Sequence, residues 1–270
     1  MADDLPHPPQ PFQLGSQQLG ALPIVHAFLA RAGVARVLGR CLPAGDARVA
    51  LPAATVIGVL VSNLCVAREP LYGLADWAGR HDPALLALQP GQAGLLNDDR
   101  VGRALDALFA ADRASLLTQL MLGVIAEFQI DCSQLHNDST SITVHGAYEA
   151  ADGRPRAGKA TVAAALGHSK DHRPDLKQFV LTLTISADGA VPIAHRLLDG
   201  NTSDDQTHIH TWDGLVVLVG RSDFLYVADC KLATREQMAH PRPWRAVRVG
   251  VGALARRGRP DPRLGADARV

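Results

Sequence analysis

The chain has 270 residues, with 27 Lys and Arg against 27 Asp and Glu, a length that suits one large or two medium domains. Residues 241–270 hold eight Arg and two Asp, so the part before them is mildly acidic and lacks the clustered cations typical of nucleic-acid-binding proteins. The four cysteines form no CxxC pair, and the start of the chain shows no secretory pattern. We therefore expect neither a zinc site nor a disulfide framework, and a reducing cytoplasmic compartment.

The first half of the chain is predicted to be helical. Residues 1–18 are rich in Pro and Gln and are expected to be disordered. Apolar residues then recur at three- and four-residue steps, which predicts an all-α N-terminal domain over residues 19–130. Its expected helices lie near residues 22–33, 53–67, 71–78, 98–110 and 113–128. Such helices could form a DNA-binding or assembly module, or a plain bundle beside a catalytic domain, and both alternatives stay open.

One uncharged run within this half has close to the length that spans a bilayer, from Val49 to Ala67. It contains Pro52, Ser62 and Asn63, and the chain offers no second candidate span. We therefore expect a buried helix here and no membrane segment.

After Asp131 the pattern changes from helical to strand-like. Two β-rich runs carry a carboxylate each: Asp138 lies within Gln134–Val144, and Asp229 directly follows Phe224–Ala228. Two further strands and a helix are predicted between them, near residues 179–186, 191–198 and 203–218.

Two strand-borne carboxylates favour a divalent-metal site. Mg²⁺ prefers carboxylate oxygens, and two such ions about 4 Å apart can stabilise both the attacking and the leaving oxygen when a phosphodiester is cleaved. The alternative is that Asp138 and Asp229 are only turn or helix-cap residues.

Four blocks of sequence resemble, in order, those of a bacterial insertion-sequence transposase of the DDE type. They are His136–Ser141, Gly167–Gln178, Leu198–Asp204 and Val227–Asp229. The similarity covers roughly residues 19–239 and includes the helical segment Leu96–Leu105.

This resemblance implies an α+β chain, with the all-α domain followed by a partial RNase H-like mixed β-sheet core over residues 131–240. In the family, three acids bind two Mg²⁺ ions, and we expect Mn²⁺ to substitute. Asp138 matches the first acid and Asp229 the second. The third, a glutamate on a later helix, has no match, because only Glu236 follows Asp229 and it belongs to the helix expected directly after the fourth strand.

The resemblance stops near residue 240. We expect truncation or a change of reading frame at this point, with residues 241–270 forming a disordered, Arg-rich tail. The alternative is a selected basic tail that binds DNA.

The polar segment before the second strand supplies the predicted DNA contacts. These candidates are His168, Lys170, His172, Arg173 and Lys177, whose side chains would complement phosphate charge; the alternative is a solvated turn. The implied partner is double-stranded DNA, at element ends and in the target, with no membrane partner and a homodimer left open. The implied location is the cytoplasm, in association with the nucleoid.

The predicted function is that of a DNA transposase that performs metal-dependent strand cleavage and strand transfer at element ends. Because the third acid is missing, we expect this polypeptide to have little or no activity. The alternative is a non-catalytic fragment that binds element ends or inhibits intact transposase, and a third possibility is a host nuclease on the same core.

Overall fold

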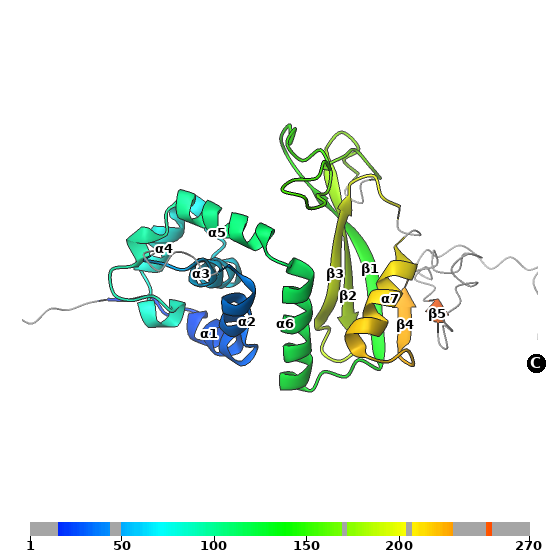
Figure 1. Ribbon diagram of the computed structural model, residues 1–270, viewed down its shortest axis with the longest axis horizontal. Coiled ribbons are helices and arrows are strands. Elements are labelled where there is room, and N and C mark those ends of the chain that lie inside the picture. Colours follow the sequence, from blue (N-terminus) through cyan, green and yellow to red (C-terminus); the bar gives the residue numbers. More distant parts are fainter. Residues whose placement is uncertain (1–15, 44–49, 169–171, 204–206, 229–246, 250–270) are drawn as a thin grey trace, which may run out of the picture. The chain divides into compact units, whose positions relative to one another are not determined.

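The computed structural model describes residues 16–43, 50–168, 172–203, 207–228 and 247–249 (Figure 1). The chain divides into two compact units, residues 1–127 and 128–270. Each unit is described by itself.

The described part of unit 1 is built from helices. They are α1 (Leu22–Arg31), α2 (Val34–Cys41), α3 (Ala53–Val66), α4 (Leu74–Gly79), α5 (Asp98–Ala110) and α6 (Arg113–Phe128), with short 3₁₀ turns η1 (Leu71–Gly73), η2 (Pro83–Leu86) and η3 (Ala93–Leu95). Asn97 caps α5 as its sequence predicts, because its side-chain oxygen accepts a hydrogen bond from the Arg100 N–H at 2.9 Å. Gly33 adopts a φ of +68° and begins α2, a helix that the sequence did not predict.

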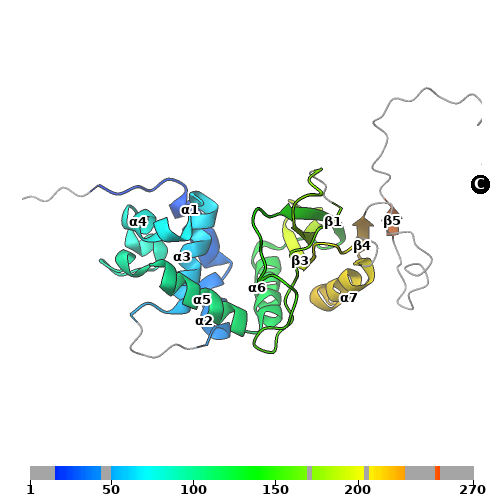
Figure 2. The ribbon, with the colours of Figure 1, turned by 90° about the horizontal axis from the view of Figure 1, so that it is seen from above.

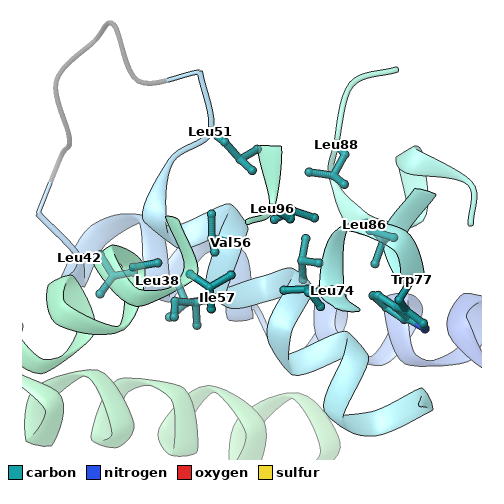
Figure 3. Packing of buried hydrophobic residues seen from close by; sticks show 14 of the residues in the cluster. Leu38, Leu42, Leu51, Val56, Ile57, Leu74, Trp77, Leu86, Leu88 and Leu96 are labelled. Carbon is teal, nitrogen blue, oxygen red and sulfur yellow. The ribbon is translucent and has the colours of Figure 1, made fainter. Parts of the chain in front are cut away.

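The uncharged run from Val49 to Ala67 contains α3, which lies in the hydrophobic core of unit 1. Val56 and Val59 are completely buried, and Figure 3 shows Val56 among leucines from neighbouring segments, with Leu74 and Leu96 also completely buried. Burial within the unit therefore explains why this helix lacks charges.

Among the described residues, a single helix with the length and apolar composition of a membrane span is not found. Three sharply bent helix pairs meet those two criteria only when their members are combined.

Unit 2 contains a mixed sheet, which makes the chain an α+β protein. Its strands are β1 (Gln134–Thr143), β2 (Gln178–Ser186), β3 (Pro192–Asp199), β4 (Leu225–Ala228) and β5 (Val247–Val249), in the spatial order β3-β2-β1-β4-β5. Strands β1, β2 and β3 pair antiparallel, whereas β4 runs parallel to both β1 and β5.

Strand β5 lies inside the segment that the sequence predicted to be a disordered tail. Its Val-Arg-Val sequence pairs with Tyr226–Ala228 of β4, and β-branched residues on either side of one polar residue suit a strand. For these three residues the disordered-tail prediction is wrong. Residues 241–246 and 250–270 lie outside the described residues.

Helix α7 (His208–Val219) packs on one face of the sheet (Figures 1 and 2). Its Trp212 ring lies 4.5 Å from the ring of Phe224 and 5.9 Å from that of Tyr226. The Tyr226 hydroxyl hydrogen-bonds to His208 Nδ1, and burial raises the pKa of this tyrosine. These contacts define the covered face of the sheet.

The covered face also carries polar side chains from β1 and β2. Asn137, Thr182, Thr184 and Ser186 are all buried, and the Thr184 hydroxyl donates to Asn137 Oδ1 at 2.9 Å. Because a strand alternates its side chains, residues next to these in sequence point to the opposite face. We call it the open face because Asp138, Thr140 and Leu183 on it are exposed.

A close crossing of main chains joins the segment before β2 to the end of β3. We call this contact, formed by Gly167, Gly200 and Gln178, the glycine crossing. A Cβ atom on Gly167 would overlap the carbonyl oxygen of Gly200, and one on Gly200 would overlap that of Gln178. The buried Gln178 side chain donates to the Gly200 carbonyl at 2.8 Å.

We predict that Gly200→Ala destabilises the protein, because its methyl group would also lie 2.5 Å from the Ala165 carbonyl oxygen, where only main-chain movement can relieve the clash. The expected loss in free energy of unfolding is about 2–3 kcal/mol, measured by urea denaturation. Gly214→Ala on α7 is the matched control, since its Cβ would meet nothing within 4 Å. Equal effects of the two substitutions would contradict the close crossing.

Candidate functional site

Asp138 lies in the middle of β1, the strand between β2 and β4. Its side chain is on the open face, and it is exposed, whereas its neighbours Asn137 and Ser139 are buried. The Ser139 N–H donates to Asp138 Oδ1 at 2.8 Å and so orients the carboxylate. The structure therefore places this predicted acid where solvent can reach it.

Two histidines share the open face with Asp138. His136 lies two residues before it on β1, and its Nε2 accepts a hydrogen bond from the Gln134 amide at 2.8 Å. Leu183 of β2 lies between Asp138 and His195, because it pairs with Asp138 of β1 on one side and with His195 of β3 on the other. Asp138 and His195 are thus two strand spacings, roughly 10 Å, apart. Across the described ranges, no group of three His, Cys, Asp or Glu side chains is close enough to hold a metal ion.

The pairing of β1 with β4 has a constant offset. Gln134 pairs with Leu225, Leu135 with Tyr226 and His136 with Val227, so the two residue numbers always differ by 91. Asp138 and Asp229 also differ by 91. Asp229 itself lies outside the described residues, as does Glu236, so the predicted metal pair stays a prediction.

The predicted DNA contacts lie in the segment before β2. His168 and His172 are exposed, and His172 has a φ of +57°. The His168 carbonyl accepts a long hydrogen bond from the Gln178 side chain at 3.4 Å. Lys170 lies outside the described residues.

Arg173 and Lys177 both have partners within the chain. The Arg173 guanidinium donates to Asp175 through two hydrogen bonds, of 2.9 and 2.7 Å, and Lys177 Nζ donates to the Ala147 carbonyl. The Arg173 hydrogen bonds lower the pKa of Asp175 to about 2. Any phosphate bound here would compete with these partners.

This segment and Asp138 lie at different points along the sheet. Gln178 pairs with Thr143, five residues after Asp138. At about 3.4 Å per residue that is roughly 17 Å along β1. The predicted DNA contacts are thus at one end of the strand and the predicted metal ligand is at its centre.

The connection between β1 and β2 contains a paired element that was not predicted from the sequence. Asp152 pairs with Ala163 and Arg156 with Lys159, so residues 151–164 form a narrow two-stranded ribbon. We call these residues the arm. Its small residues lack the β-branched pattern of a strand, and the one usable signal was the Ala157-Gly158 pair at its turn.

Comparisons with known proteins add little to this geometry. A family model described as a domain of unknown function, DUF4277, matches residues 14–122. No curated protein matches the chain. One solved structure, a Mos1 transposase paired-end complex with the left transposon end, aligns with 72% of this chain at 11% sequence identity. Its TM-score of 0.24 does not establish a shared fold, and this chain covers 57% of the length of that protein.

We predict that Asp175 titrates near pH 2 and that Arg173→Ala returns its pKa toward the ordinary value of about 3.9. The pKa of Asp175 is lower in the folded than in the unfolded chain. Its contribution to stability is therefore fully present at pH values above the ordinary pKa, and it is lost as the pH falls toward 2. Carboxyl-carbon NMR measures the titration. Arg221→Ala, which removes an arginine just before β4, should leave the pKa of Asp175 unchanged. An Asp175 pKa that is the same with and without the Arg173 side chain would contradict the ion pair.

Proposed function

We propose that this chain carries the catalytic core of a DNA transposase, in which Asp138 and Asp229 hold Mg²⁺ for strand cleavage and strand transfer at element ends. The observation that carries the proposal is the register of β1 and β4. Their described pairs differ by 91 positions, as do the two acids.

Continuing this register by two residues would set Asp229 opposite Asp138. Cα atoms of neighbouring strands are about 4.8 Å apart, and side chains of paired residues point to the same face. His136 and Val227 are paired, so two residues later both acids would face the open side, away from α7. Carboxylates at this spacing can hold ions about 4 Å apart.

The sheet order supports an RNase H-like core. Three antiparallel strands are followed by α7, and then β4 returns to pair parallel with β1, giving the order β3-β2-β1-β4-β5. In this arrangement the first and fourth strands are neighbours; Asp138 lies on the first, and Asp229 directly follows the fourth in sequence.

The residues of the chain fit hard metal ions. Asp138 offers exposed carboxylate oxygens on a rigid central strand, and the Ser139 N–H holds one of them in place. When bound, Mg²⁺ would supply an activated water or 3′ hydroxyl and stabilise the leaving oxygen. The chain contributes the spacing and orientation of the ligands.

We further propose that this polypeptide turns over slowly or not at all. Glu236 is the one glutamate after Asp229, only seven residues on, whereas the family places its third acid on a later helix. A poorly positioned metal costs much of the rate, since a displacement of about 1 Å can cost roughly a hundredfold. A non-catalytic protein that binds element ends is the second candidate, and the position of Glu236 only seven residues after Asp229 is the observation that favours it.

We predict that the full chain binds Mn²⁺ and that Asp138→Asn and Asp229→Asn each weaken binding at least about tenfold, because each removes a charged ligand. Titration followed by electron paramagnetic resonance measures free Mn²⁺. Asp106→Asn is the control, since Asp106 is an exposed acid of α5 in unit 1. Equal Mn²⁺ affinity in all four proteins would refute the metal site.

A nicking assay separates the candidate functions. The substrate is a supercoiled plasmid that carries the DNA flanking the gene, incubated with Mg²⁺ or Mn²⁺. Slow nicking at fixed positions that Asp138→Asn abolishes supports the catalytic proposal. Binding of this DNA without nicking supports the end-binding protein, and nicking that is indifferent to the flanking DNA supports a host nuclease.

A further inference from the structure

The arm, residues 151–164, is a defined ribbon. The N–H and carbonyl groups of Arg156 and Lys159 exchange two hydrogen bonds of 2.9 Å. Between them Ala157 and Gly158 have φ values of +48° and +73°, the signs of a type I′ hairpin turn. The Thr161 hydroxyl donates to the Arg154 carbonyl at 2.8 Å and links the two sides.

The base of the arm is fixed to the sheet. The Ala163 N–H donates to Asp199 Oδ1 at 2.7 Å, and the Gly200 N–H donates to the Ala163 carbonyl at 3.1 Å. Ala165 pairs with Gln178 at the start of β2. A ligand that contacts the arm would therefore be held in a set position relative to the strands.

The arm carries a net positive charge, whereas the chain before residue 241 is mildly acidic. Residues 151–164 contain Arg154, Arg156 and Lys159 against one acid, Asp152. The Arg154 side chain is 86% exposed and lies 3.6 Å from Asp152. Between these cations the ribbon consists mainly of Gly, Ala and Pro, so no bulky side chain keeps its backbone from a close approach to a ligand.

The cations of the arm have different surroundings. Arg156 donates to the Ala150 carbonyl and pairs with Asp152 at 3.3 Å, so it holds the ribbon together. Arg154 projects farther into solvent. Lys159 faces Arg156 across the ribbon, next to the turn.

We propose that the arm contacts the phosphate backbone of duplex DNA through Arg154 and Lys159. This inference rests on the proposed function, because it assigns DNA as the ligand. The arm connects the end of β1 to the start of β2, so it belongs to the same end of the sheet as Arg173 and Lys177. Cations on a narrow ribbon contact phosphates without reading base sequence, and they position a duplex on the protein.

The distance along β1 sets where this contact falls on the DNA. Thr143, at the end of β1 where the connection to the arm begins, lies roughly 17 Å from Asp138 along the strand. At 3.4 Å per base pair this separation equals about five base pairs. The base of the arm is fixed at this end of the sheet, so its cations would contact backbone away from the phosphate at Asp138.

The test is the salt dependence of duplex binding by the full chain, measured by fluorescence anisotropy with a labelled duplex of the flanking DNA. Each phosphate contact contributes about 0.9 to the slope of log affinity against log salt concentration. Arg154→Ala should reduce the slope by about 1 and Arg154→Ala/Lys159→Ala by about 2. Arg221→Ala removes an exposed arginine of the same unit just before β4 and should leave the slope unchanged.

Each outcome decides the proposal. Reduced slopes in the arm variants alone, with circular dichroism unchanged, support it, even if the chain never cleaves DNA and the catalytic proposal fails. Slopes that match those of the unchanged chain and of Arg221→Ala overturn the arm contact while leaving the metal site standing. No binding of the duplex by the unchanged chain at low salt overturns the arm contact as well.

Discussion

The hydrogen-bonded ladders on both edges of β1 constrain everything else in unit 2. This strand pairs antiparallel with β2 and parallel with β4, and side chains alternate between the covered and open faces. A slip by one residue would turn Asp138 under α7 and move Asn137 into solvent. Burying that carboxylate without a partner would be costly, so the register that stabilises the sheet also determines which face carries the acid.

The covered face explains how this register is held. Leu135 and Tyr226 are paired and completely buried, and Tyr226 lies beneath the aromatic contacts of α7. The Asn137–Thr184 hydrogen bond adds a polar contact between β1 and β2 that forms only in one alignment. The face under α7 therefore provides packing and alignment, whereas the open face is available for chemistry.

Much of the architecture could be predicted from local sequence, because its signals are local. The helical period and the Asn97 cap identify α5, and alternation together with β-branched residues identifies β1 and β2. Helix α2 was missed because Gly33 reads as a helix end, although here it only separates two short helices. The arm was missed because its Gly, Ala and Pro residues carry no strand preference, and its pairing depends on the turn and on contacts at its base.

The sequence predicted the strand that carries Asp138, but not the contacts that the other candidate residues make within the chain. The pattern placed Asp138 on a strand, and the structure puts it at an exposed central position. It could not show that Arg173 is already bound to Asp175, or that Lys177 reaches the carbonyl of Ala147, which is 30 residues away. The Lys177 contact depends on the folded path of the chain. Arg173 and Asp175 are only two residues apart, so their pairing was a local signal that the sequence reasoning missed.

The glycine crossing has a consequence for how this region can vary. Its closest approaches are between main-chain atoms, and the Gln178 side chain adds a hydrogen bond to the Gly200 carbonyl, so these contacts fix the start of β2 and the end of β3. The tip of the ribbon at Ala157 and Gly158 is not part of these contacts. Residues inserted there would lengthen the projection while the two glycines kept the ends of β2 and β3 aligned, which makes the tip the natural place for a change of reach or specificity.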